Sequence, residues 1–506
     1  MASGESSAPQ TKRVKSAIPL VAAVAVFLLL SIGLYRDYIT DDLFIHLQFA
    51  RNISTGNGFA FNPGQPVYGS SSALWVLLVA FLGLFSQNFL LLSKILGILF
   101  GVGSLLLFFK LSGDIIDKLS VSFLICVLLA VDPWFSRWAA SGMEVPAVAF
   151  FVILGIISHR KEIQREFEGF PFSPIIFAIV TWLRPEGVML FLFALISLLL
   201  NAPKGKKTAT VLKALGIYVV TFLPWLLYAY FTFGRIIPTT AMVKSGGGAS
   251  LRGILIALFE FGKIYGATYL LMGVLISLAL LRYLRRGKPG LRRILNFARQ
   301  NFLILAWVVI LPLVYASRGL LAGSRYLTPS MILILIAGGL GIEYLLSPEG
   351  RIRTGRKLIP ILIILLLVFE PLLVNAITYG NVYQGGVIGY RQAHEYIGKW
   401  IEANTPESAI IAAWDVGVVA YYSHRRIIDV AGLMDPEILK YEDRIEYIKE
   451  KGADYLVIQG VVPEELLRER PELRGVLVPL FTREMIRGPG RPDPVYFTVY
   501  KCNFRN

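Results

Sequence analysis

The segment Asp37–Trp75 decides the fold and the place of the candidate site. Its polar, glycine-punctuated runs are DYITDDLFIHLQFARN (37–52), GNGFAFNPG (56–64) and VYGSSSALW (67–75). It directly follows Ala17–Tyr35, an apolar run with the length that a helix needs to cross a bilayer. Two adjacent carboxylates, Asp41 and Asp42, therefore lie just beyond the expected membrane surface. This arrangement favours chemistry on a substrate that arrives from the bilayer.

The composition is that of a polytopic membrane protein. Of the 506 residues, 55% are hydrophobic, and the mean hydropathy is +0.62; soluble domains are usually about 45–50% apolar. The formal net charge is +16, but the basic residues gather between apolar runs. These basic stretches are Lys12-Arg13-Lys15, Arg160-Lys161, Lys204-Lys206-Lys207, Arg282-Arg285-Arg286-Lys288 and Arg351-Arg353-Arg356-Lys357. Short basic loops are typical of the cytoplasmic side of a membrane. Alternating loops do not form one contiguous face, so nucleic acid is not expected as a partner.

The apolar runs and the basic loops together predict the topology. We expect a cytoplasmic N-terminal tail at 1–16, a membrane domain at 17–375 with about eleven spans, and a first external loop at 36–72. After the first span, the others are expected at 88–110, 119–134, 145–159, 172–183, 187–200, 209–231, 253–283, 300–316, 328–346 and 357–375. We interpret the stretch 73–86 as a juxtamembrane or re-entrant helix, because counting it as a span would place the basic loops outside. The protein is then a multi-pass plasma-membrane protein with an extracytoplasmic C-terminus.

The polar motifs fall in loops on the predicted external side. They are Asp132-Pro-Trp-Phe-Ser-Arg137, Ser141-Gly-Met-Glu144, Arg184-Pro-Glu186, Gly234 through Lys244, Ser317-Arg318 and Ser324-Arg325-Tyr326-Leu-Thr-Pro329. The predicted cytoplasmic loops contain little besides Lys, Arg and scattered acids. This asymmetry predicts that the active face lies outside.

The composition changes after about residue 376, where short β-rich runs begin to alternate with helical patterns. The expected strands lie at 409–413, 426–430, 455–459, 476–481 and 495–500, and the expected helices at 390–403, 436–451 and 463–470. This alternation indicates a small α/β domain over 376–506. The fold class expected for the whole chain is a polytopic α-helical membrane protein with a C-terminal extracytoplasmic α/β domain.

The Asp41-Asp42 pair suits general-base chemistry. Adjacent residues on a helix point about 100° apart, so one carboxylate can face a reacting hydroxyl while the other orients a partner or a cation. A carboxylate is a suitable base for the hydroxyl proton of a sugar acceptor. The alternative is helix capping, with Thr40 or Asp41 at the start of a helix that begins at Leu43. The two roles are compatible.

Three charged residues lie near the predicted outer helix ends: Glu144, Arg184 and Glu186. A charge at membrane depth usually marks a pathway or a site. A structural ion pair between Arg184 and one of the glutamates is the alternative to a substrate role.

Three basic residues can serve a phosphate group: Lys244, Arg318 and Arg325. A phosphate leaving group needs positive charge where negative charge develops, and the arginine fork matches phosphate oxygens. The alternative is binding of lipid headgroups by basic residues at the membrane interface.

The metal requirement is left open by the sequence. The four histidines, His46, His159, His394 and His424, have no zinc-site spacing. Asp41, Asp42 and Glu144 offer oxygens that can bind a hard divalent cation.

Several of these motifs resemble signatures of one enzyme superfamily. The first loop contains Asp41-Asp42, Ala50-Arg51-Asn52, Gly56-Asn-Gly58, Asn62-Pro-Gly64, Tyr68-Gly69 and Leu74-Trp75. Together they resemble the first-loop signature of integral-membrane glycosyltransferases of the GT-C superfamily. The prokaryotic branch of arabinofuranosyltransferases and related mannosyltransferases is the most similar. Further likeness is found at Ser141–Glu144, Leu183–Gly187, Pro238–Lys244, Arg325–Pro329, Asp415–Gly417 and Asp429–Leu433.

The resemblance implies a polyprenyl- or dolichyl-phosphate sugar donor and an external active site. It implies that Asp41 or Asp42 is catalytic, with Asp41 slightly favoured as the first acid of the pair. The substrate-binding positions carried over from the motifs are Arg51, Glu144, Arg184, Glu186, Lys244, Arg325 and Tyr326, and Arg318 is added as a candidate phosphate contact because of its charge. Pro238-Thr239-Thr240 departs from the expected Pro-Asn-Thr, and the α/β tail departs from the carbohydrate-binding β-domain of actinobacterial members. The sugar and the acceptor are therefore left open.

The sequence thus predicts an inverting glycosyltransferase, hexosyl or pentosyl, that acts on an extracytoplasmic glycan, lipid or protein. A transporter or flippase of lipid-linked sugars is the alternative, but it would need polar groups through the membrane midplane. A lipid phosphatase or phosphotransferase would need a His or Ser nucleophile near an arginine, which the external motifs do not show.

Overall fold

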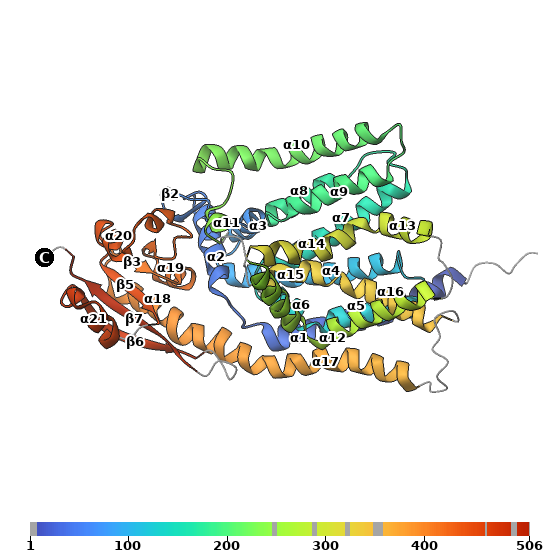
Figure 1. Ribbon diagram of the computed structural model, residues 1–506. Coiled ribbons are helices and arrows are strands. Elements are labelled where there is room, and N and C mark those ends of the chain that lie inside the picture. Colours follow the sequence, from blue (N-terminus) through green and yellow to red (C-terminus); the bar gives the residue numbers. More distant parts are fainter. Residues whose placement is uncertain are drawn as a thin grey trace, which may run out of the picture.

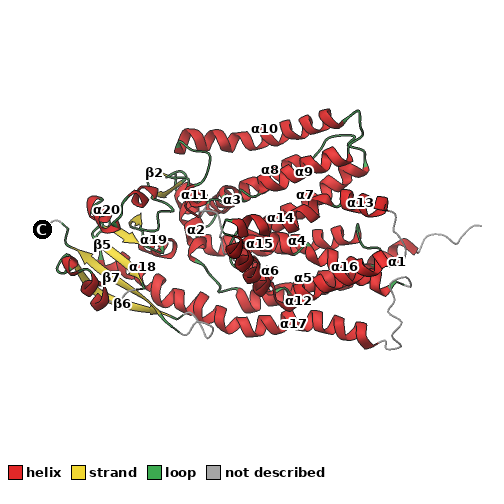
Figure 2. Ribbon diagram, in the orientation of Figure 1, coloured by secondary structure: helices red, strands yellow, loops and turns green. Residues whose placement is uncertain are grey.

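A computed structural model describes residues 8–244, 250–285, 291–318, 324–347, 358–460, 463–486 and 493–504. Figure 1 shows a bundle of long helices with a smaller domain at one end, and Figure 2 shows that this smaller domain contains a sheet. The expected fold class is confirmed: the chain is mostly helical, and its C-terminal part forms a small sheet domain.

Every predicted span contains a helix. The helices up to the tail domain are α1 (Ala8–Tyr35), α2 (Asp41–Ser54), α3 (Ala73–Gly83), α4 (Phe89–Gly113), α5 (Leu119–Val131), α6 (Pro133–Ala140), α7 (Val145–Gln164), α8 (Ser173–Leu183), α9 (Gly187–Asn201), α10 (Lys207–Phe233), α11 (Thr239–Lys244), α12 (Leu251–Arg285), α13 (Leu291–Gln300), α14 (Phe302–Ser317), α15 (Ser324–Met331), α16 (Ile334–Leu346) and α17 (Leu358–Tyr383). Among the described residues, 5 helical stretches have the length and composition to cross a membrane, or up to 6 with the bent pair α5–α6. The total of about eleven spans stays a prediction.

Helix α3 is short, as the juxtamembrane interpretation requires. It has 11 residues, whereas a helix needs about 20 to span a bilayer. The indole of Trp75 at its start donates a hydrogen bond of 3.0 Å to the carbonyl oxygen of Gly142. This bond fixes α3 beside the link between α6 and α7, at the same end of the bundle as α2 (Figure 1).

The polar motifs gather at one end of the bundle. Helices α2, α3 and α11 lie at the end that carries the tail domain (Figure 1). The connection between α9 and α10, which contains the basic stretch 204–207, lies at the opposite end (Figure 1). This basic connection and the motif helices therefore lie at opposite ends of the bundle. The basic stretch 351–357 and the end of the stretch 282–288 lie outside the described residues.

The tail domain follows α17 through two π-helical segments, Gln384–Gly389 and Arg391–Glu395. Helix α17 thus runs past the expected boundary at residue 376. The sheet has the order β4-β3-β5-β7-β6, with β3 parallel to β4 and β5 and with β7 antiparallel to β5 and β6. Its strands are β3 (Ile410–Ala413), β4 (Arg426–Asp429), β5 (Tyr455–Gln459), β6 (Leu477–Met485) and β7 (Val495–Cys502), and its α-helices are α18 (Tyr396–Asn404), α19 (Val416–Ser423), α20 (Arg444–Glu450) and α21 (Pro463–Glu469). Each expected strand has its counterpart.

The tail domain is docked on the first loop by specific hydrogen bonds. The side chain of Asn62, in the β1–β2 hairpin (Ala60–Asn62 and Gln65–Pro66), accepts from the backbone N–H of Ile427 at 2.9 Å and donates to its carbonyl at 2.8 Å. Arg51 on α2 donates to the carbonyl oxygen of Tyr421 at 2.9 Å. These bonds join β4 and α19 to the loop that carries the Asp41-Asp42 pair.

Candidate functional site

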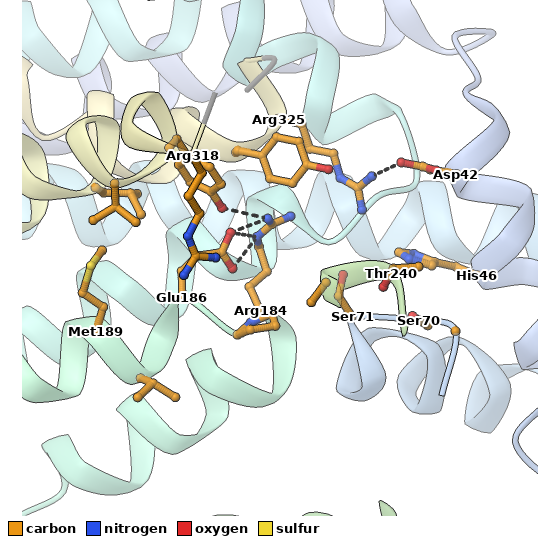
Figure 3. Close-up of a pocket in the computed structure, with 18 of the residues that line it drawn as sticks. Asp42, His46, Ser70, Ser71, Arg184, Glu186, Met189, Thr240, Arg318 and Arg325 are labelled. Atoms are coloured by element: carbon orange, nitrogen blue, oxygen red, sulfur yellow. Dashed lines mark hydrogen bonds and ion pairs between the residues drawn. The ribbon is translucent and has the colours of Figure 1, made fainter. Parts of the chain in front are cut away.

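A cavity of about 530 Å³ opens where α2, α9, α11, α14 and α15 meet. Its polar lining consists of Asp42, His46, Ser70, Ser71, Arg184, Glu186, Thr240, Tyr315, Arg318, Arg325 and Tyr326, and its apolar lining includes Ile45, Val188, Met189, Leu192, Leu311 and Val314. In Figure 3, Asp42 and Met189 lie at opposite sides of the cavity, with Arg184 and Arg318 between them. The cavity therefore has a charged middle and one apolar end.

Asp42 faces this cavity from the first turn of α2. Thr40 is the N-cap of α2, and its hydroxyl accepts the N–H of Leu43. The Asp42 carboxylate accepts a hydrogen bond from Arg325 at 2.5 Å and keeps 36% of its side chain exposed. The carboxylate is therefore oriented by the arginine and still accessible to a ligand.

Arg325 and Arg184 share one fully buried carboxylate. Glu144 has 0% exposure and accepts from Arg325 at 3.0 Å and 3.2 Å and from Arg184 at 2.8 Å. Arg184 also pairs with Glu186. A buried charge is tolerated only when it is paired and hydrogen-bonded, so Glu144 holds both arginines in place. The ion pair considered as the alternative role of Arg184 is present, and Arg184 also lines the cavity.

Two tyrosines complete the arginine cluster. The guanidinium of Arg184 lies over the ring of Tyr326 at 4.4 Å, and Arg325 lies at 5.6 Å from the same ring. The hydroxyl of Tyr315 accepts from Arg184 at 3.3 Å. These contacts are typical of a preorganised cationic site.

Arg318 is the most accessible cation of the cavity. It is the C-cap of α14, is exposed, and forms no ion pair with any carboxylate that the structure describes. Lys244 ends α11, and its side chain lies outside the described residues.

Asp41 points to the tail domain and does not line the cavity. Its two carboxylate oxygens accept from the backbone N–H groups of Gly417 and Val418, at 3.0 Å and 2.9 Å, at the N-terminus of α19. Burial and the neighbouring Asp415 raise the pKa of Asp41 to about 8, although the two N–H donors act in the opposite direction. Asp415 in turn lies 3.0 Å from a ring nitrogen of His394.

Arg51 also belongs to the domain interface. Besides its bond to Tyr421, its guanidinium lies 4.8 Å from the centre of the Tyr421 ring. The residues predicted for the site therefore separate into two groups. Asp42, Arg184, Glu186, Arg318, Arg325 and Tyr326 line the cavity, with Glu144 directly behind them, whereas Asp41 and Arg51 contact the tail domain.

The three carboxylates considered for a cation do not form one ligand set in the structure. Asp41 contacts α19, Asp42 contacts Arg325, and Glu144 contacts both buried arginines. Within the described ranges, no group of three or more His, Cys, Asp or Glu side chains has the geometry of a metal site.

The sequence analysis predicted no site role for five polar residues of the cavity: His46, Ser70, Ser71, Thr240 and Tyr315. The position of His46 was accessible, because residues four apart on a helix share a face and His46 follows Asp42 by four positions on α2. Ser70 and Ser71 carried no such signal, since their approach to Thr240 depends on how α11 packs against the first loop. Thr240 lies in the Pro238–Lys244 motif, although no site role was predicted for it.

The comparisons with known proteins bear mainly on the fold. Residues 381–496 match a family model described as a domain of unknown function, DUF8728. No curated protein sequence matches the chain.

Three solved structures resemble the chain over most of its length. The oligosaccharyltransferase of Archaeoglobus fulgidus, tethered to an acceptor peptide, is 12% identical, with a TM-score of 0.60 over 88% of this chain and 69% of that one. ArnT from Cupriavidus metallidurans bound to undecaprenyl phosphate is 11% identical, with a TM-score of 0.55 over 97% of this chain and 98% of that one. The apo state of the same ArnT is 10% identical, with a TM-score of 0.57 and the same coverage. At these identities the likeness establishes the fold alone: the chain shares the GT-C-type fold of these structures.

Proposed function

We propose that the protein is an inverting glycosyltransferase that takes a sugar from a polyprenyl- or dolichyl-phosphate carrier. The observation that carries this proposal is the order of groups along one cavity: apolar side chains, then arginines, then an accessible carboxylate. A lipid-phosphate sugar has the same order of chemical parts, namely an apolar chain, an anionic phosphate and a sugar that reacts with a hydroxyl.

The apolar end suits the lipid chain. Val188, Met189 and Leu192 line the cavity from α9, and Leu311 and Val314 line it from α14. Val188 is 43% exposed and Leu192 is 51% exposed, so the apolar wall continues onto the outer surface of the bundle. A lipid chain can therefore reach the cavity along these two helices while the rest of it stays in the bilayer.

The arginines suit the phosphate. Arg184 is already paired with Glu144 and Glu186, so Arg318 is the cation best able to take a new anion. Preorganised positive charge stabilises the negative charge that develops on a departing phosphate. Arg318, supported by Arg184, is therefore the proposed phosphate contact.

Asp42 is the proposed general base. The acceptor hydroxyl transfers its proton to the Asp42 carboxylate as its oxygen bonds to the anomeric carbon. The bond from that carbon to the phosphate oxygen breaks, and lipid phosphate leaves with the electron pair. Arg325 orients the base, and Glu144 orients Arg325. The geometry shifts the preferred residue of the pair from Asp41 to Asp42, because only Asp42 lines the cavity.

The solved relatives support this class of donor and leave the acceptor open. One ArnT structure contains undecaprenyl phosphate, and the oligosaccharyltransferase structure contains an acceptor peptide. For this protein we propose a glycan, lipid or protein acceptor on the extracytoplasmic side, with the tail domain on the same side. The positive-inside distribution of the basic loops supports this orientation.

The test is transfer by the purified protein from a panel of polyprenyl- and dolichyl-phosphate sugars. Asp42→Asn should lower kcat by about 10²- to 10⁴-fold while the variant still binds the donor. Asp37→Asn is the matched control, because Asp37 forms exposed ion pairs with Arg36 and Arg391 outside the cavity. Turnover of a folded Asp42→Asn variant within a few-fold of the wild type would refute the role of Asp42. Absence of transfer with every donor, combined with movement of lipid-linked sugar across vesicles, would favour a flippase instead.

A further inference from the structure

One buried hydroxyl of the cavity, that of Thr240, has no hydrogen-bond partner among the described residues. Thr240 is only 9% exposed, and its Oγ1 atom makes no hydrogen bond with any group that the structure describes. Thr240 lines the cavity (Figure 3). A buried hydroxyl that is left unsatisfied is unfavourable, so a group that enters the cavity and bonds to it would be stabilised.

Two serines from a distant segment of the chain line the same side of the cavity as Thr240, and the three hydroxyls form one wall of the cavity. Ser70 and Ser71 belong to the first loop and line the cavity beside Thr240 (Figure 3). The Ser70 oxygen accepts the N–H of Ser72 at 3.2 Å, which leaves the Ser70 proton able to donate. Each hydroxyl can both donate and accept, as the hydroxyls of a sugar ring do.

The wall is held rigidly from behind. The backbone N–H of Thr239 donates to the carbonyl oxygen of Tyr68 at 2.9 Å, and the Thr239 hydroxyl lies 2.6 Å from the carbonyl oxygen of Leu433 in the tail domain. The Tyr68 hydroxyl accepts from the indole of Trp225 at 2.7 Å. Residues next to both ends of the wall are therefore anchored, and the three hydroxyls are preorganised.

We propose that Ser70, Ser71 and Thr240 form the subsite for the transferred sugar, and that this sugar is neutral. The proposal rests on the proposed function, since it places the ring between the phosphate at Arg318 and the base Asp42. The three side chains are uncharged, and the neighbouring Asp42 is already paired with Arg325. The accessible charges beside this wall, Asp42 and Arg318, are occupied in the proposed reaction by the acceptor hydroxyl and the phosphate. A charged ring substituent would therefore lack a partner of its own, whereas neutral hydroxyls find three.

The test is a binding measurement that does not depend on turnover. The probes are a short polyprenyl phosphate and the same carrier bearing mannose, glucose, arabinofuranose, an amino sugar or a uronic acid. Thermal unfolding of the detergent-solubilised protein gives the affinity for each probe. At least one neutral sugar should bind more tightly than the bare carrier, and the charged sugars should not.

Thr240→Val keeps the shape of the side chain and removes the hydroxyl. It should weaken binding of the favoured sugar carrier by about tenfold to a hundredfold, while binding of the bare carrier is unchanged. Thr240→Ser, which keeps a hydroxyl, should retain the higher affinity for the sugar-bearing carrier. Thr221→Val is the matched control, because the Thr221 hydroxyl donates to the carbonyl oxygen of Ile217 within α10 and Thr221 is not among the described residues that line the cavity.

The subsite proposal is overturned if no neutral sugar binds better than the bare carrier, or if Thr240→Val keeps the full gain. Tighter binding of a carrier that bears a charged sugar would refute the proposal that the transferred sugar is neutral. A different result would contradict the proposed function. If the sugar-bearing carrier binds more tightly than the bare carrier in a Thr240-dependent way, but no sugar is transferred to any acceptor, the subsite is supported and the transferase activity is not.

Discussion

Replacing Gly417 by alanine should displace the candidate base, although Gly417 lies in the tail domain. A Cβ atom at this position would lie 2.1 Å from the carbonyl oxygen of Asp41 and 3.0 Å from its carbonyl carbon. Real Cβ atoms essentially never approach a backbone atom more closely than 3.0 Å. Helices α19 and α2 must therefore separate by roughly 1 Å, and overpacking of this kind typically costs about 1–3 kcal/mol.

The separation also breaks the contact that joins the two domains. The bonds from Gly417 and Val418 to Asp41 are 3.0 Å and 2.9 Å long, and an extension of about 1 Å takes both beyond hydrogen-bonding range. With its raised pKa, Asp41 is mainly protonated near neutral pH. Hydrogen bonds between neutral groups contribute about 0.5–1.5 kcal/mol each, so docking should weaken by about 1–3 kcal/mol. Asp42 follows Asp41 directly, and a misplacement of about 1 Å can lower the rate about 10²-fold.

The assay compares Gly417→Ala with Gly380→Ala in detergent by transfer kinetics, thermal unfolding and tryptic release of the tail domain. Gly380 lies in α17 with nothing within 4 Å of an added Cβ, so its replacement should be neutral or slightly stabilising. A Gly417→Ala protein with wild-type kcat, Tm and protease resistance would refute the idea that the tail domain positions Asp42.

Three further predictions follow from the same geometry. Arg318→Ala should raise KM for a lipid-phosphate sugar about tenfold or more, with Tm unchanged, and an unaltered KM would place the phosphate elsewhere. Burial and Asp415 raise the pKa of Asp41 to about 8, so the docked state retains a proton that the undocked state loses near pH 4. Docking should therefore weaken as pH rises from about 4 to about 8. The Tm of Asp41→Asn should change less with pH over this range than the Tm of the wild type. Equal slopes of Tm against pH for the two proteins would contradict this linkage. A cysteine at Glu450, in a Cys502→Ser background, should react with an impermeant maleimide on intact cells, and labelling only after lysis would place the tail domain in the cytoplasm.

Much of the architecture could be predicted from the sequence because the physical signals are local. Apolar runs of membrane length predicted the helices, and β-rich runs bounded by turns predicted the five strands of the tail sheet. The predicted topology placed the motif loops on one side of the membrane, and in the structure Asp42, Arg184 and Arg325 from three of these loops line one cavity. Fine boundaries were less accessible: α17 continues past residue 376 to Tyr383, because neither proline nor glycine ends the helix at 376.

Only the tertiary structure decided which carboxylate of the Asp41-Asp42 pair lines the cavity and which contacts the tail domain. Local sequence makes the two residues equivalent, since both are carboxylates in the first turn of one helix. Their side chains point about 100° apart, and long-range partners then decide what each contacts: α19 satisfies Asp41, and Arg325 orients Asp42 toward the cavity. The hydroxyl wall has the same origin, because Thr240 lies beside Ser71 only when α11 packs on the first loop. Periodicity and composition determine helices and strands, whereas a site built from distant segments depends on contacts that no local pattern encodes.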